Sequence, residues 1–251
     1  MTNSSYHPHK VRSGFFAFNA IVLLGAILTL LPQATHALEV KDGQRIVLLG
    51  NTLAERMQHH GWLETYAQLS MPDKKLTFRN HGFCGDKIDN RPRNRGFIDP
   101  HTYLEISKAD VILTFFGANE AWDNNPADYG TKLSKWVDET LGKKYNGQSA
   151  PVIVLFSPIA HENLDSPNFP DGKEQNERLK KIAEVTAKVA KDKKLEYVDL
   201  FAASQKLFQE NKSSASSSGD PSNSHSHLTL NGIHLTSEGN DHIARIILKA
   251  I

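Results

Sequence analysis

Four short segments carry side chains that could together cleave an ester bond. His234 precedes a predicted helix start, and an imidazole can act as a general base near neutral pH. Thr52 has a hydroxyl that such a base could activate for attack on an acyl carbon. The Asn119 amide and the unobstructed backbone N–H of Gly85 could donate hydrogen bonds to the oxyanion that attack creates. These residue types predict acyl transfer.

The sequence also leaves a structural interpretation open for each of these residues. Asn51 and Thr52 suit a helix N-terminus, Gly85 suits a tight turn, and an amide such as Asn119 often bonds to nearby backbone. A single histidine is more often structural than catalytic. The chemical interpretation therefore depends on the four segments meeting in space.

Asn231 lies three residues before His234, at a position where an enzyme would usually carry Asp. A carboxylate there orients the imidazole and stabilises the imidazolium that forms during attack. A neutral amide can accept a hydrogen bond from Nδ1–H but supplies no charge, and it can select the wrong tautomer. We predict that Asn231 orients His234 and that the reaction is slower than it would be with Asp at this position.

Alternating strands and helices must position these residues. Strands are predicted over 45–50, 76–80, 110–117, 151–158 and 195–200, and helices over 52–69, 126–145, 173–194 and 237–251. The third strand is apolar throughout, which is typical of a parallel strand covered on both faces. A parallel sheet brings the loops that follow its strands to one edge. Thr52, Gly85 and Asn119 all lie in such loops.

The first 37 residues predict an export signal. Lys10 and Arg12 precede the uncharged run 15–31, and small residues follow it. An uncleaved membrane anchor is the alternative. Both interpretations place the remaining residues, 38–251, in the periplasm or outside the cell, and their length fits a single domain.

Composition excludes several other classes of function. Lys10 and Arg12 are the only charged residues of 1–37, so 38–251 holds 27 Lys+Arg and 28 Asp+Glu, a net charge of −1. This balance gives no support for a nucleic-acid or anionic-lipid partner. Cys84 is the only cysteine, so no intrachain disulfide can form. No zinc-binding or nucleotide-binding motif is present, and we predict neither a metal nor another cofactor.

The Ser-rich segment 211–227 predicts a flexible surface insertion.

In their order along the chain, the four segments resemble the blocks of the SGNH (GDSL-type) hydrolase superfamily. The family's Gly-Asp-Ser-Leu block is similar to Gly50-Asn51-Thr52-Leu53, and its glycine block is similar to the segment around Gly85. Its Gly-x-Asn-Asp block is similar to residues 117–120, and its Asp-x-x-His block to residues 231–234. The resemblance implies a flavodoxin-like three-layer α/β/α sandwich around a parallel sheet of about five strands. It also implies hydrolysis of acyl or acetyl esters, often those of carbohydrates or lipids.

The resemblance assigns a role to each matching residue. Thr52 stands in place of the nucleophilic Ser, His234 is the base, and Asn231 replaces the Asp that orients it. Gly85 and Asn119 match the oxyanion donors. The chain departs from the family at Thr52 and Asn231, which are both catalytic positions.

Four further residues of the same loops are predicted to contact the substrate: Asp86, Arg91, Glu120 and Trp122. This polar and aromatic set favours a sugar ester as substrate. The alternative is a non-catalytic module that uses the same fold to bind a glycan or an acylated ligand. The sequence does not indicate an oligomeric state.

Overall fold

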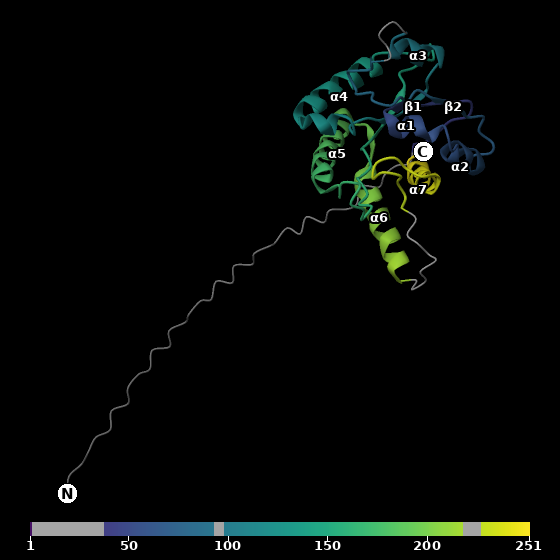
Figure 1. Cartoon of the computed structure of the whole chain (residues 1–251). Helices are drawn as coiled ribbons and strands as arrows, with labels where there is room; N and C mark the ends of the chain where they lie inside the picture. The colour runs from purple at the N-terminus through teal and green to yellow at the C-terminus, as the bar shows by residue number, and fades with distance from the viewer. Residues whose placement is uncertain (2–37, 93–97, 218–226) are drawn as a thin grey trace. The chain divides into compact units, whose positions relative to one another are not determined.

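The computed structural model describes residues 1, 38–92, 98–217 and 227–251 (Figure 1). The predicted export signal lies outside this part of the chain apart from Met1, so it stays a prediction. The predicted flexible insertion 211–227 is only partly covered, because residues 218–226 also lie outside. Residues 211–217 form the end of a helix instead of a loop, so the insertion cannot begin where the sequence suggested.

Five parallel strands form a single sheet in the order β2-β1-β3-β4-β5, which confirms the predicted sheet. The central pair, β1 and β3, is in register from Ile46 opposite Val111 to Gly50 opposite Phe115. Both strands therefore end at the same edge of the sheet. The strand bounds are β1 (Arg45–Gly50), β2 (Thr77–Asn80), β3 (Val111–Phe115), β4 (Val152–Phe156) and β5 (Glu196–Val198).

Helices cover the sheet in two groups, as Figure 1 shows: α2 packs on α7, and α4 packs on α5. This arrangement is the predicted three-layer sandwich. The α-helices are α1 (Thr52–Met57), α2 (Trp62–Ser70), α3 (Pro100–Ile106), α4 (Pro126–Leu141), α5 (Lys173–Lys193), α6 (Leu200–Ser217) and α7 (Ser237–Leu248). A short 3-10 helix, η2 (Glu120–Asp123), lies between β3 and α4.

Buried aliphatic and aromatic side chains hold the layers together. All five residues of β3 are buried, as its continuous apolar sequence predicted. The rings of Phe115 and Phe156 stack across neighbouring strands with their centroids 4.6 Å apart. Burial of these strands on both faces supplies the main stabilisation of the fold.

The helices differ from the predicted pattern at three places. The single helix predicted over 52–69 is two helices, because the chain turns at Gly61, where φ is +65°. Helix α3 was not predicted, since it is short and its start is marked only by the Asp99 cap and Pro100. Helix α6 was also missed, because it begins inside the run 195–200 that reads as strand.

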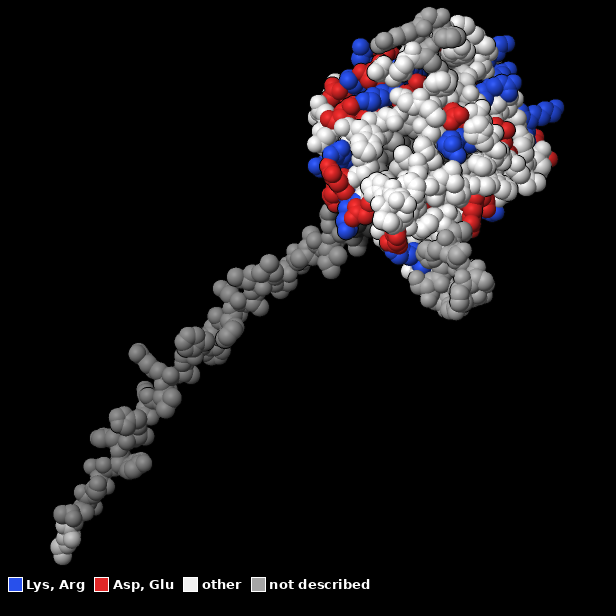
Figure 2. All heavy atoms as spheres, in the orientation of Figure 1, with Lys and Arg blue, Asp and Glu red and all other residues white. Residues whose placement is uncertain are grey.

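The helices and one face of the molecule (Figure 2) reflect the charge pattern of the sequence. Across 38–92, 98–217 and 227–251, no helix combines the length and apolar character needed to cross a membrane. On the face shown in Figure 2, basic and acidic side chains are interspersed around a central area of uncharged residues. This mixture agrees with the near-neutral composition.

Gly82 sets how closely the loop after β2 approaches α1. A Cβ at this position would lie 2.3 Å from the backbone nitrogen of Glu55, well inside contact distance. We expect Gly82→Ala to lower the free energy of unfolding by about 1–3 kcal/mol, because the loop and α1 must move apart. Urea denaturation followed by circular dichroism measures the change.

Gly142→Ala is the matched control. Gly142 has a right-handed backbone conformation at the end of α4, and an added Cβ would make only ordinary contacts, at 3.5 Å. This variant should be as stable as the wild-type protein or slightly more stable. Equal stability of the two variants would show that the approach of Gly82 to α1 is not tightly packed.

Candidate active site

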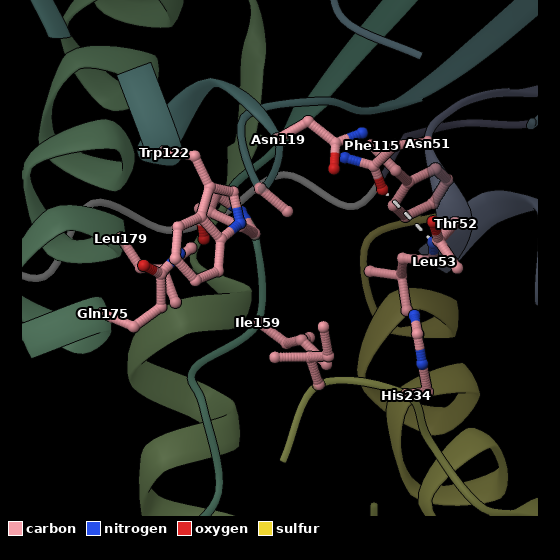
Figure 3. A pocket seen from close by; sticks show the side chains of 14 residues that line it. Asn51, Thr52, Leu53, Phe115, Asn119, Trp122, Ile159, Gln175, Leu179 and His234 are labelled. Atoms are coloured by element: carbon pink, nitrogen blue, oxygen red, sulfur yellow. Dashed lines mark hydrogen bonds between the residues drawn. The ribbon is translucent and has the colours of Figure 1, made fainter. Parts of the chain in front are cut away.

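Thr52, Asn119 and His234 line one cavity at the carboxyl edge of the sheet (Figure 3). The cavity is partly enclosed and opens to solvent. Its wall combines amide and hydroxyl groups with apolar side chains. The lining residues are Asn51, Thr52, Leu53, Phe115, Ala118, Asn119, Trp122, Ser157, Pro158, Ile159, Gln175, Leu179, Ile233 and His234.

The end of β1 fixes the position of Thr52. Asn51 is the N-cap of α1, and its side-chain oxygen accepts a hydrogen bond of 3.2 Å from Leu53 N–H. The backbone N–H of Asn51 donates to the Phe115 carbonyl at 3.2 Å, which ties this turn to β3. Thr52 is the first residue of α1 and is half-buried in the cavity wall.

Asn119 reaches the cavity from the loop after β3. Its Nδ2 donates a hydrogen bond of 2.9 Å to the Asp86 carbonyl, which joins the loops that follow β2 and β3. An amide nitrogen carries two hydrogens, so this bond leaves the second one for another acceptor. Asn119 can therefore be held in place and still donate to a ligand.

The side chain of Asn231 fixes the loop that carries His234. Its Oδ1 accepts hydrogen bonds from the backbone N–H groups of His234, at 3.0 Å, and Ile233, at 3.4 Å. Its Nδ2 lies 3.1 Å from His234 Nδ1. Rotating the amide by half a turn would set its NH2 group against two N–H donors, so this orientation is the stable one.

The amide orientation of Asn231 determines the tautomer of His234. Because Nδ2 can only donate, His234 Nδ1 must accept, and the proton of the neutral imidazole lies on Nε2. A base in a catalytic triad needs the opposite tautomer, with Nε2 free to accept the nucleophile's proton. No hydrogen bond joins Thr52 to His234 among the described residues. The site is assembled, but its resting proton arrangement is not that of an active triad.

Burial and two nearby charges set the pKa of His234. Burial lowers the pKa of His234 below its usual value, and the positive charge of Arg56 lowers it further, whereas Glu55 opposes the shift. Asp241, which follows on α7, is bonded instead to Tyr66 and Arg245. Near neutral pH, the imidazole is therefore uncharged.

The sequence matches the model of the GDSL-like lipase/acylhydrolase family over residues 48–242. The chain belongs to this family. No curated protein is significantly similar to it in sequence. The family match confirms the resemblance to SGNH hydrolases, whose common chemistry is the hydrolysis of esters.

Three solved structures illustrate the fold that this GDSL-family chain shares. The gut microbial diltiazem-metabolizing enzyme BT4096 has 22% identity and a TM-score of 0.59, over 84% of this chain but only 47% of that one. The acetyl xylan esterase AlAXEase has 18% identity and a TM-score of 0.56, over 82% and 99%. A catalytic mutant of Axe2, an acetylxylan esterase from Geobacillus stearothermophilus, has 16% identity and a TM-score of 0.59, over 84% and 95%. At these identities the likeness shows the fold alone.

Gly85, the matching residue of the family's glycine block, lies in an exposed turn. Its φ is +82°, and Asp86 N–H closes the turn by donating to the Phe83 carbonyl at 3.2 Å. Gly85 is not among the residues that line the cavity. The structure does not bring it together with Thr52 and Asn119 as the motif order predicted.

Glu120 is buried and bonds to the backbone of the loops around the site. The side chain is 4% exposed, and its oxygens accept hydrogen bonds from Ile88 N–H at 2.7 Å and Gly117 N–H at 2.9 Å. Burial raises the pKa of this carboxyl, and the backbone donors oppose that shift. The structure therefore places Glu120 outside the set of residues that line the cavity, a position that motif matching could not reveal.

Asp86 and Arg91 also lie away from the cavity. Asp86 is buried and contributes its backbone carbonyl to Asn119. The Arg91 guanidinium lies over the Phe116 ring, 5.0 Å from its centroid, and borders a separate cavity with His101. Of the four predicted substrate contacts only Trp122 lines the cavity, and it is 62% exposed at the cavity wall.

The structure also identifies a residue that no sequence motif marks. Glu162, in the loop after β4, is buried and accepts hydrogen bonds from Leu228 N–H and Thr229 N–H at 3.2 and 2.7 Å. It thus contacts the segment that leads to His234. A lone Glu after an apolar strand has no motif or periodicity that would mark such a role.

The described residues contain no group of three or more His, Cys, Asp or Glu side chains arranged to hold a metal ion.

The shifted pKa of His234 can be measured directly by NMR titration of the imidazole. We expect a value below about 6.5, the ordinary histidine value, because burial and Arg56 both disfavour the imidazolium. Arg56→Gln should raise this pKa by removing a positive charge. Glu55→Gln, the matched control, should lower it. A wild-type value at or above that of an exposed histidine would contradict this account.

Proposed function

We propose that the chain is an exported hydrolase of acyl esters, with Thr52 as nucleophile and His234 as general base. One observation carries the proposal: Thr52, Asn119 and His234, from three distant segments of a GDSL-family chain, line one cavity. The apolar, basic-flanked start of the sequence supports export.

In the proposed reaction, Thr52 Oγ1 attacks the acyl carbon while its proton passes to Nε2 of His234. The second amide hydrogen of Asn119 and the backbone N–H of Thr52 stabilise the oxyanion. Gly85 lies outside the cavity in this structure. Its N–H would join these donors after a movement of its turn toward a bound ligand. His234 then protonates the leaving alcohol, and water hydrolyses the acyl-threonine by the same steps in reverse order.

The cavity wall indicates which part of an ester each side receives. Phe115, Ile159 and Leu179 are buried apolar residues that suit the acyl group. Trp122 offers an exposed ring against which a sugar alcohol could stack. Two structural neighbours are acetyl xylan esterases, which supports carbohydrate esters as a substrate class. With Asp86, Arg91 and Glu120 outside the cavity wall, Trp122 is the predicted substrate contact that still supports a sugar.

The Asn231 contact favours a second candidate, a non-catalytic module that binds an acylated ligand. With its proton on Nε2, His234 is a hydrogen-bond donor toward the cavity and cannot accept the proton of Thr52. Catalysis then requires a rare tautomer or a rotated amide. Binding of a carbonyl oxygen requires neither.

Hydrolysis of p-nitrophenyl acetate, p-nitrophenyl butyrate and acetylated xylose tests the first candidate. We expect Thr52→Val to abolish turnover, because valine keeps the shape of threonine but lacks the hydroxyl. His234→Ala should do the same. Thr52→Ser, the matched control, should retain at least the wild-type rate, since serine lacks the methyl group that crowds attack. Equal rates for the wild-type protein and Thr52→Val would reject Thr52 as the nucleophile.

Asn231→Asp tests the tautomer argument. The carboxylate can accept from Nδ1–H, which frees Nε2, so we expect turnover to rise by up to about 10⁴-fold, the loss that the reverse exchange causes in a serine protease triad. Imidazole ¹⁵N shifts should show the proton moving from Nε2 to Nδ1. A changed tautomer without a rise in turnover would support the binding module.

A further inference from the structure

Glu162 is a buried carboxylate that contacts the segment leading to His234. Three donors converge on Glu162: Leu228 N–H at 3.2 Å, Thr229 N–H at 2.7 Å and the Thr229 hydroxyl at 2.6 Å. Its side chain is 5% exposed. An ionised carboxylate accepts from all three donors at once, whereas a neutral side chain of the same shape would place a donor against one of them.

Two further hydrogen bonds connect Glu162 and Thr229 to Gly232, which lies close to His234 in the loop. The Thr229 hydroxyl accepts a hydrogen bond of 3.0 Å from Gly232 N–H. The backbone N–H of Glu162 donates to the Gly232 carbonyl at 2.8 Å. Gly232 is thus held at both of its backbone polar groups, one position after Asn231 and two before His234.

The neighbouring His161 packs against the same loop. A Cβ at Gly232 would lie 2.2 Å from the His161 imidazole, so only glycine allows this approach. His161 also bonds through its backbone to Asn176 of α5, with N–H to Oδ1 at 2.7 Å and carbonyl to Nδ2 at 2.9 Å. The loop after β4 is itself anchored, and it can therefore fix the His234 loop.

We propose that Glu162 is a positioning residue that holds the Leu228–His234 loop in the geometry the cavity requires. The proposal rests on the proposed function for its effect on turnover. Glu162 acts through the backbone and not through its charge, because the charges that shift His234 are those of Arg56 and Glu55. Its part is to set where the imidazole stands relative to Thr52.

Glu162→Gln in the full-length protein tests this role, with Glu174→Gln as control for the loss of one negative charge. The Glu174 side chain is 80% exposed and pairs with Arg178 on the surface of α5. For p-nitrophenyl butyrate, we expect Glu162→Gln to lower kcat by about 10- to 100-fold, with little change in KM, because a displaced base misses the attack geometry. The control should match the wild-type protein. An unchanged kcat in a variant that is folded by circular dichroism would overturn the proposal.

Thr229→Val and Thr229→Ser provide a second test that leaves the buried carboxylate in place. Valine removes the hydroxyl that joins Glu162 to Gly232, whereas serine retains it. Turnover should fall in Thr229→Val and be maintained in Thr229→Ser. If the two variants have equal turnover, the chain of bonds does not position His234.

Amide hydrogen exchange separates this proposal from the proposed function. We expect the Thr229 and Gly232 amides to exchange at least about tenfold faster in Glu162→Gln, while the β3 amides keep their wild-type rates. This result would support the positioning role even if the wild-type protein hydrolyses no ester. Unchanged loop exchange, or equal acceleration in β3, would overturn it.

Discussion

The pairing of β1 with β3 is the constraint on which the site depends. Their register carries both strands to the same edge, and the bond from Asn51 N–H to the Phe115 carbonyl continues it one residue beyond β1. Thr52 and Asn119 therefore reach one cavity although they lie far apart in sequence. The buried contacts that stabilise β1 and β3 therefore also fix the distance between the Thr52 hydroxyl and the Asn119 amide.

His234 reaches the same cavity by a different physical route. It lies on no strand, and its place is set by polar contacts of a loop with Asn231 and Glu162. Leu228 anchors the start of this loop in the core, whereas Leu230 and Ile233 are exposed, so the geometry between them depends on whether each acceptor meets its donors. The two acceptors act at different points, since Asn231 orients the residues next to the imidazole and Glu162 anchors the start of the loop.

The sequence was sufficient to predict the sheet and the shared cavity. Apolar runs identified β1, β3 and β4, and the alternation of short strand-like segments with helical ones identified β2 and β5. The order of the short motifs placed Thr52, Asn119 and His234 at one edge. It was insufficient for side-chain direction. Glu120 follows Asn119 directly yet turns into the protein to accept two backbone N–H groups, and Arg91 turns away to lie over Phe116. These outcomes depend on donors supplied by other loops, which adjacency along the chain does not encode.

Among the residues that the structure describes, those lining the cavity include no aspartate, glutamate, lysine or arginine. His234 is the ionisable side chain within this described set, and burial lowers its pKa, which favours the neutral ring. These lining residues thus bring no formal charge of their own, and the charges that act on His234 are those of Arg56 and Glu55. Recognition by the described wall depends on shape and on neutral dipoles, so an uncharged molecule should enter equally well in dilute buffer and in concentrated salt.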